Sequence, residues 1–415
     1  AHFESAYELL SAAGQSESTD RAVVDLILDW AVLSYYQAHL LILDDLLDRH
    51  QDAVDRLGDD TRRMWWLIWR GHAAGFRLDQ SDNMQFLDEA LEIAEMTGDE
   101  RGLAYAKTWQ IWGLFITGDI EGAIKAAADV EEWATANRHE DPYPYFKSGV
   151  IGAYALASAG RGQDVAKRCR EVIAFGQQVG NNRCVAFGHQ GLSFLETTLG
   201  NYSLAIELAE KASSTAKDPI YRDTAHLNAA AAATLAGDGP RARQAVDYLL
   251  QAVETGIELP APLFVKLADA SAMMTEGQLT VGIEQLFQTR DEAKQMSRNW
   301  EWLFAEFYIA ATFARIVTGE ATATLGHLAR NPRFIPYLRQ ARKEALPRLQ
   351  ATLDSAIQLG FNGMTQLAEV EMAKLLIHTG DKAEARRLLD SALAVVREFG
   401  EGESTERIRA LLATT

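Results

Sequence analysis

The chain has 415 residues, of which 58 are acidic and 40 are basic, so its formal net charge is −18. This acidic balance disfavours nucleic acid and anionic membranes as main partners, because both attract a positively charged face. The length exceeds that of one ordinary compact domain and fits two or three domains or one extended repeat array. No apolar run approaches the roughly 18–20 residues that a membrane-spanning helix requires.

The chain contains two cysteines, Cys169 and Cys184. They are too few for a disulfide framework, and their spacing does not form a CxxC motif. We therefore expect two reduced, buried thiols in a cytoplasmic protein. The first ten residues, AHFESAYELL, lack the basic and apolar regions of a signal peptide.

At the N-terminus, residues 3–13 predict a helix, and we interpret residues 1–20 as a cap on the array that follows. The next conspicuous stretch is RRMWWLIWRGH, residues 62–72. It carries Trp65, Trp66 and Trp69, and its apolar core is flanked by arginines. That core is too short to span a membrane, so the stretch predicts an amphipathic or buried repeat helix.

From residue 118 onward one sequence pattern recurs. It consists of an apolar helix, a Gly followed by a polar residue, and a second helix that begins two or three residues later. Glycine adopts the left-handed conformation at little cost, so a Gly after the last apolar position predicts a helix end. The pattern returns about every forty residues. The predicted turn glycines are Gly118, Gly160, Gly200, Gly237, Gly277, Gly380 and, in a weaker copy, Gly319.

A second pattern closes many of the units, and it predicts that each unit is a pair of helices. Its glycines are Gly98, Gly180, Gly360 and Gly400, and a further turn is expected near Leu78. Apolar residues fall at helical spacing on both helices of a unit. No alternating apolar pattern of a β-strand occurs. The prediction is an all-α, right-handed α–α superhelix of about nine to ten hairpins.

Two parts of the chain depart from the regular period. We divide the single solenoid into the cap, regular repeats over residues 21–318, an irregular insertion over 319–350, and C-terminal repeats with a cap over 351–415. Within the insertion, Pro332, Pro336 and Pro347 predict bends or helix starts.

Large aromatic residues gather in the N-terminal half, at positions that share one face of the predicted first helix of each unit. In one interpretation, which we favour, they pack between helices, as aromatic stripes at helical spacing usually do. In the other they line a concave groove for a peptide helix, a sugar or another flat ligand. The candidate groove residues are Trp65, Trp69, Arg70, His72, Tyr105, Trp109, Trp112, Tyr154 and Phe187.

Motifs that carry catalysis are mostly missing. No Gly-rich loop ends in Gly-Lys-Ser/Thr, and GDGPRA at 237–242 lies in a helical turn without the strand that a dinucleotide fold needs. The histidines form no HExxH pair. We therefore expect no catalytic residues, no metal site and no cofactor in this chain.

Four of the turn glycines are followed five residues later by a small alanine: Gly118 by Ala123, Gly200 by Ala205, Gly237 by Ala242 and Gly380 by Ala385. This pattern resembles the tetratricopeptide repeat, although the period is longer than usual. The stretch RNPRFIPYLRQARKEALPRLQATLDSAIQLGFNG and the following AEVEMAKLLIHTGDKAEARRLLDSALAVVREFG resemble the end of the repeat region in bacterial class III adenylate/guanylate cyclases that carry a STAND-type ATPase module. FESAYELL resembles the start of that region.

The resemblance implies a non-catalytic scaffold or sensor that regulates a signalling effector, with a nucleotide cyclase as that effector. The partner would be a protein or peptide, including other modules of the same polypeptide, and not nucleic acid or membrane. Homo-oligomers are left open. The alternative is a free-standing adaptor or sensor that binds a small ligand or peptide in the aromatic groove.

Overall fold

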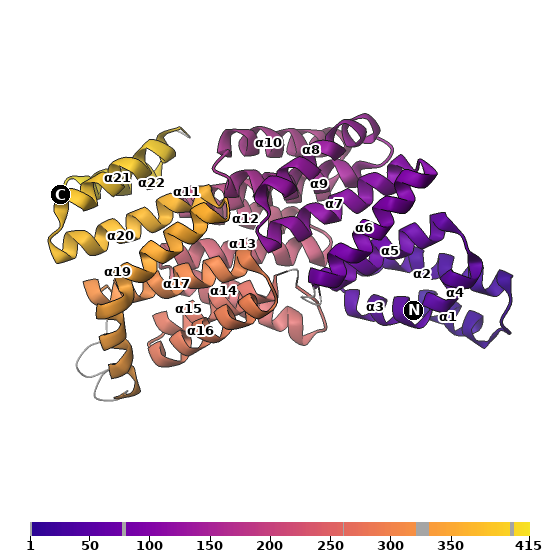
Figure 1. Ribbon diagram of the computed structural model, residues 1–415, viewed down its shortest axis with the longest axis horizontal. Coiled ribbons are helices and arrows are strands. Elements are labelled where there is room, and N and C mark those ends of the chain that lie inside the picture. Colours follow the sequence, from indigo (N-terminus) through magenta and orange to yellow (C-terminus); the bar gives the residue numbers. More distant parts are fainter. Residues whose placement is uncertain (1, 77–79, 260, 321–331, 399–401) are drawn as a thin grey trace.

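The computed structural model describes residues 2–76, 80–259, 261–320, 332–398 and 402–415. Over these residues the chain forms 21 α-helices and two short 3-10 helices, with no β-strand. This confirms the predicted all-α solenoid. Figure 1 shows the helices stacked along the long axis, from the N-terminal helices at one end to α20–α22 at the other. The first helices are α1 (His2–Ala12), α2 (Glu17–Gln37), α3 (Leu40–Arg49), α4 (Gln51–Leu57), α5 (Asp60–Phe76), α6 (Gln80–Thr97), α7 (Glu100–Thr117), α8 (Ile120–Asn137), α9 (Pro142–Ser158) and α10 (Gly162–Val179).

The second part of the chain continues the same arrangement, in which each helix packs against the next one along the chain. No helix in the described ranges has the length and apolar character to cross a membrane. The remaining elements are α11 (Asn182–Leu199), α12 (Tyr202–Thr215), α13 (Pro219–Ala236), α14 (Gly239–Glu254), α15 (Pro262–Thr275), α16 (Leu279–Gln295), α17 (Asn299–Thr318), η1 (Pro332–Phe334), α19 (Ile335–Gln358), η2 (Asn362–Met364), α20 (Thr365–Thr379), α21 (Lys382–Arg397) and α22 (Glu403–Leu412).

The tight turns follow from the Gly-polar pattern. At the α7–α8 turn, Gly118 has a φ of 90°, and the Asp119 carboxylate accepts the backbone N–H of Gly122 at 2.9 Å. The glycine ends one helix and the aspartate caps the next. All seven predicted turn glycines have a positive φ, as do Gly98, Gly180 and Gly360. Gly400 and the turn expected near Leu78 lie outside the described residues.

The two irregular regions have different structures. Helix α1 has no buried residue and packs on α2 through Phe3 and Trp30, whose ring centroids are 5.8 Å apart. In the segment 319–350, residues 321–331 lie outside the described ranges. Beyond them Pro332 is the first residue of η1. Pro336 lies in the first turn of α19, and Pro347 lies inside this helix without ending it. The proposed boundaries at 20, 318 and 350 stay predictions, as does the right-handed sense of the superhelix.

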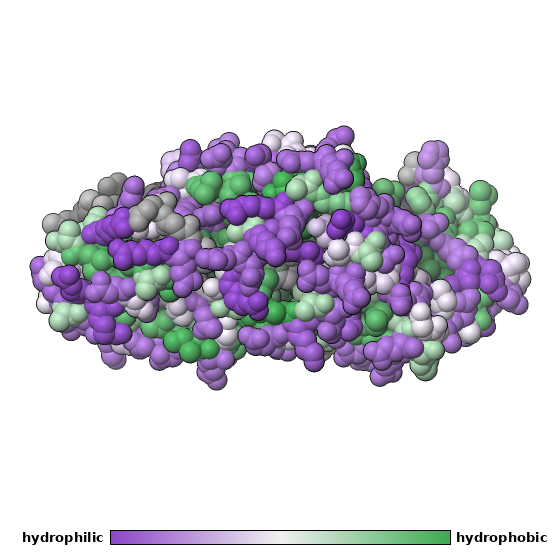
Figure 2. Space-filling model, turned by 90° about the horizontal axis from the view of Figure 1, so that it is seen from above, coloured by the Kyte–Doolittle hydropathy of each residue, from purple (hydrophilic) through white to green (hydrophobic). Residues whose placement is uncertain are grey.

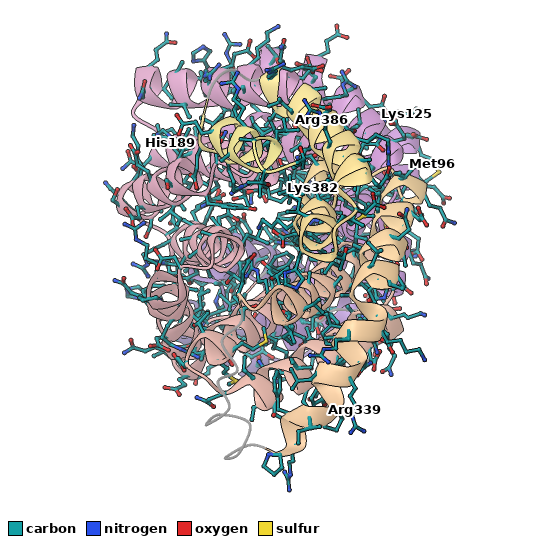
Figure 3. All side chains as sticks on the ribbon, turned by 90° about the vertical axis from the view of Figure 1, so that its left-hand side faces the viewer. Met96, Lys125, His189, Arg339, Lys382 and Arg386 are labelled. Carbon is teal, nitrogen blue, oxygen red and sulfur yellow. The ribbon has the colours of Figure 1, made fainter. Side chains whose placement is uncertain are left out.

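The superhelix is wound tightly enough for its successive turns to touch. Helix α2 contacts α13, α7 contacts α17, and α11 contacts α20. Viewed along the long axis from the C-terminal end, the helices surround a common centre (Figure 3). The inner helices of one turn therefore pack against those of the next turn and leave little of the central space open.

Hydrogen bonds join successive turns of the superhelix. Their acceptors lie at the C-terminal ends of helices that face its centre, and we call this line of contact the seam. The amide of Asn299 donates to the Thr117 carbonyl at 2.6 Å. The last carbonyls of a helix have no partner within the helix. Side chains from the next turn of the superhelix satisfy them here. The other seam bonds are Arg298 to the Gly75 carbonyl and Gln366 to the Thr198 carbonyl.

The seam is closest at Gly363 in η2. A Cβ atom added at this position would lie 1.9 Å from the carbonyl oxygen of Ala157, near the end of α9. No side chain fits at that distance, so η2 and α9 can approach this closely only because residue 363 is glycine.

We predict that Gly363→Ala destabilises the protein by about 1–3 kcal/mol or more, because the added methyl group forces the two superhelical turns apart. Chemical denaturation monitored by circular dichroism measures the loss. The matched control is Gly14→Ala, where an added Cβ meets nothing within 4 Å. Equal stabilities of the two variants would contradict the close packing at the seam.

Candidate functional site

Most of the predicted groove residues lie in the interior. Trp69, His72, Trp109, Tyr154 and Phe187 are between 1% and 6% exposed. The His72 ring stacks on the Trp109 ring with a centroid separation of 3.5 Å. This burial agrees with the packing interpretation of these five side chains. A role for them in ligand binding stays a prediction.

The cover over these rings comes from helices far away in sequence. Tyr35 on α2 lies against Trp109 at 5.6 Å between centroids, and its hydroxyl is 3.3 Å from the hydroxyl of Tyr221 on α13. Burial raises the pKa of both phenols well above their usual value. The winding of the superhelix thus places α2 and α13 together at the point where a groove would have to be open.

A lysine lies at the centre of this aromatic cluster. Lys147 on α9 is 5% exposed. Its Nζ lies 4.2 Å from the ring centroid of Phe187 and 4.9 Å from that of Tyr221, with Tyr35 and Trp109 at 5.1 and 5.4 Å. Cation–π attraction offsets part of the cost of burying the amine. No carboxylate among the described residues forms an ion pair with it, and burial lowers the pKa of Lys147 well below its usual value.

Two other predicted residues, Trp65 and Tyr105, are only partly buried. Their ring centroids are 5.0 Å apart, and the Arg101 guanidinium lies 4.9 Å from the Trp65 ring. Asp141 accepts hydrogen bonds from Arg101 at 2.7 Å and from the Tyr105 hydroxyl at 3.0 Å. The polar groups around these rings are therefore already bonded to one another.

The contacts of Arg70 and Trp112 also argue against an open groove. Arg70 bonds Gln51 at 2.9 Å, pairs with Asp48, and lies 4.5 Å from the ring of Phe86. It is thus tied to neighbouring helices of its own superhelical turn. Trp112 is partly buried and packs across the seam against Trp300, with centroids 6.5 Å apart.

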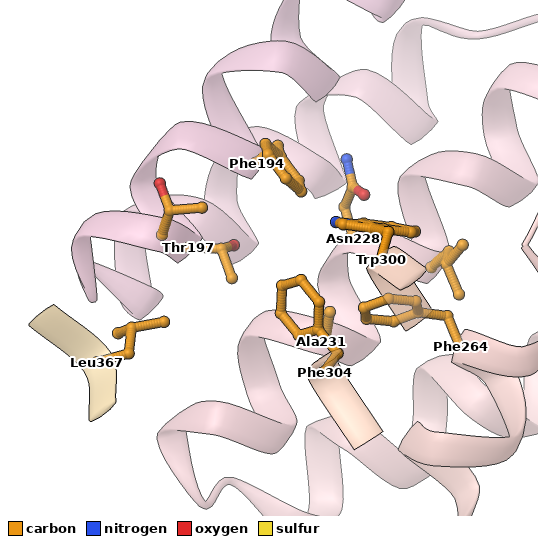
Figure 4. Close-up of a pocket in the computed structure, with 10 residues that line it drawn as sticks. Phe194, Thr197, Asn228, Ala231, Phe264, Trp300, Phe304 and Leu367 are labelled. Carbon is orange, nitrogen blue, oxygen red and sulfur yellow. The ribbon is translucent and has the colours of Figure 1, made fainter. Parts of the chain in front are cut away.

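A small enclosed cavity lies beside Trp300 (Figure 4). Its volume is about 30 Å³, and Phe194, Phe264 and Phe304 form much of its wall. The indole nitrogen of Trp300 has no hydrogen-bond partner among the described residues. A space of this size holds a water molecule and not an organic ligand.

A larger cavity of about 480 Å³ opens in the C-terminal half, between α12–α17, α20 and α22. Its size is within the range of small-molecule sites. The wall from α13 and α14 is made of small residues, including Ala233, Ala236 and Ala242. Where the N-terminal half places tryptophan and tyrosine, this part of the chain places alanine and glycine, so the central space is not filled.

This cavity is the candidate functional site, and its chemistry is polar and charged. It is lined by Arg315, Lys374, Arg407 and Glu371, and by the hydroxyl-bearing side chains of Tyr202 and Tyr308. None of the nine predicted groove residues lines it. The only hint in the sequence was the scarcity of tryptophan after Trp133, where two of the nine tryptophans lie, and such a change also occurs where only the packing differs. No group of three potential metal ligands occurs among the described residues.

We predict that Lys147→Met raises the free energy of unfolding at pH 7 by on the order of 1 kcal/mol, since it removes a buried amine that has no carboxylate partner among the described residues. The pKa of Lys147 is lower in the folded chain than in the unfolded chain. The unfolded chain therefore binds more protons between those two pKa values, and stability rises with pH there. The advantage of the variant should shrink as the pH approaches 10.

Urea denaturation of both proteins between pH 7 and pH 9.5 measures this difference. The control is Lys125→Met, which removes an exposed lysine (Figure 3). If both substitutions change stability equally at every pH, Lys147 is not buried as the structure places it.

No family model matches the sequence, and no curated protein matches it. Among solved structures, one similar chain is described as a "Circular tandem repeat protein with novel repeat topology and enhanced subunit contact surfaces". It is 15% identical, the match covers 96% of this chain and 99% of that chain, and the TM-score is 0.19. The two chains do not superimpose closely enough for residues of one to be equated with residues of the other.

Proposed function

We propose that this chain is a cytoplasmic, non-catalytic helical-repeat scaffold that binds another protein and regulates a signalling effector. The helical-repeat fold supports this role, since solenoids present extended surfaces built from many similar units. The tetratricopeptide-like turns, in which Gly118 and Asp119 join two helices, fit the resemblance from which the proposal starts. The effector that the resemblance implies is a nucleotide cyclase with its ATPase module.

The observation that carries the proposal is a group of four exposed aliphatic residues on either side of the turn between α2 and α3, which we call the apolar patch. Val32, Leu33, Leu41 and Ile42 are 45%, 44%, 48% and 55% exposed. Exposed clusters of aliphatic side chains mark protein-interaction sites more often than isolated ones do. The face of the molecule shown in Figure 2 is mostly hydrophilic, with apolar side chains scattered along its length, including the end that holds α1–α4.

The position of the patch favours the effector as its occupant. The resemblance is to a repeat region that follows the cyclase and ATPase modules, and α2 and α3 are among the first helices of this chain. A module that precedes such a region would meet these helices first. The patch residues are aliphatic, so we expect the contacting surface of the effector to be apolar as well.

A second function, ligand sensing, is favoured by one specific observation, the cavity of about 480 Å³ between α12–α17, α20 and α22. The rings at the centre of the predicted aromatic groove are buried, so we favour this cavity as the ligand site of a sensor. Scaffold and sensor roles are compatible, because the patch and the cavity share no residue.

The test of the scaffold role is site-specific cross-linking in the source organism. We expect a photoreactive amino acid at Ile42 to cross-link to a nucleotide cyclase or its ATPase module, within the same polypeptide or in another, identified by mass spectrometry. The same group at Val281, which is 49% exposed on α16, should not. We further expect Leu41→Asp with Ile42→Asp to change cyclase activity, because buried carboxylates are costly at an apolar interface.

A cross-link from Ile42 to a protein of another class would contradict the cyclase part of the proposal. Identical products from Ile42 and Val281 would contradict the apolar patch as the docking surface. The control for cyclase activity is Val281→Asp, which adds the same charge to an equally exposed position.

A further inference from the structure

We propose that the large cavity binds a small organic anion, whose phosphate or carboxylate group lies between Arg315 and Arg407 and whose apolar body lies against the wall. This goes beyond the scaffold function and does not depend on it. The cavity is a positively lined site in a chain whose net charge is −18.

Arg315 reaches the cavity from α17 and is half-buried. It donates one hydrogen bond to the Leu235 carbonyl at 3.3 Å, at the end of α13. No carboxylate among the described residues pairs with it. One side of the guanidinium is thus fixed to the end of α13, and its other N–H groups are available to an oxyanion.

Arg407 reaches the cavity from α22. Its guanidinium lies 5.0 Å from the ring centroid of Tyr202 and packs against the backbone at Gly200, where an added Cβ would lie 2.5 Å from its Nη2. It too has no carboxylate partner in the described part of the chain. Its Nε is buried and has no hydrogen-bond partner there either. A planar arginine held against a ring in this way is suited to bind a phosphate or a carboxylate.

The other charged side chains of the cavity form no close ion pair with these two arginines. Glu371 is 8% exposed and pairs with Lys374 at 2.6 Å, so these two neutralise each other. Glu320 lies at an exposed position on the rim. Leaving two partly buried guanidinium groups without a counter-ion is costly, and a bound anion would remove that cost.

Two buried hydroxyl groups in the wall also lack partners. The Tyr308 side chain is 5% exposed and Thr234 is 7% exposed, and neither hydroxyl has a hydrogen-bond partner among the described residues. Buried polar groups are expected to be hydrogen-bonded. The oxygens of a ligand in the cavity, or water that it orders, would provide the missing partners.

Part of the remaining wall is apolar and includes Met274, Leu279 and Ala311. The volume of about 480 Å³ is much larger than a phosphate ion, so an anion alone would leave this wall in contact with water. A ligand with both an anionic group and an apolar body uses the whole site.

Isothermal titration calorimetry on the full chain, at constant ionic strength, tests the proposal with phenyl phosphate and phenylsuccinate as probes. Inorganic phosphate supplies the anion without the body, and benzyl alcohol supplies the body without the anion. We expect at least one organic anion to bind more tightly than both of these. Binding by only one of the two anions assigns the site to phosphate or to carboxylate.

We expect Arg315→Gln and Arg407→Gln each to weaken that binding by about tenfold, the loss of one charge-assisted contact. Arg386→Gln removes an equal charge from the exposed face of α21 (Figure 3) and should leave binding unchanged. Arg315→Lys and Arg407→Lys keep the charge and serve if a glutamine variant does not fold, with an expected smaller loss.

Three results would overturn the proposal: no binding by either organic anion, equal binding by benzyl alcohol, or equal weakening in Arg386→Gln. The titration does not involve the effector or the apolar patch, so its outcome is independent of the cross-linking result.

Discussion

The architecture depends on the carbonyl groups that end the inner helices. A helix leaves its last carbonyls without partners inside the helix, and in an isolated hairpin water would satisfy them. Here the next superhelical turn supplies the donors, as Asn299 does for Thr117 and Gln366 does for Thr198. These bonds fix how tightly the solenoid is wound. Once the turns touch, the concave face is an interior, and its residues are packed as a core.

The tight winding explains the contrast between the two halves. In the first half the centre is filled by tryptophan and tyrosine, and Tyr35 meets Tyr221 across the turns. In the second half the inner surface of α13 is built from alanine, and the same winding leaves the cavity beside Arg315. Large aromatic residues therefore mark where the central space is closed, and small residues mark where it stays open. This winding favours the packing interpretation of the aromatic face over the groove interpretation, which needs a more open superhelix.

The hairpins could be predicted from the sequence because their signals are local. Gly118 ends a helix and Asp119 caps the next within five residues. The seam could not be predicted in this way. The structural roles of Asn299 and Gly363 lie in contacts with residues about two hundred positions earlier in the chain. Which residues come into contact depends on the pitch of the whole superhelix. For the same reason nothing in PYPYFKSG indicated that Lys147 would lie among four rings contributed by four other helices.

The same long-range contacts connect the two proposed sites. Arg315 in the cavity is bonded to the end of α13. Nearer its start, α13 carries Tyr221, whose hydroxyl meets that of Tyr35 on α2. Tyr35 lies within one helical turn of Val32 and Leu33 in the apolar patch. An anion that binds the other N–H groups of Arg315 would draw this side chain toward itself and, through the bond to the Leu235 carbonyl, would shift the end of α13. Because the aromatic centre is close-packed, such a shift would be transmitted to α2 and not absorbed locally. A ligand in the cavity thereby has a physical route to the surface on which the effector is proposed to dock.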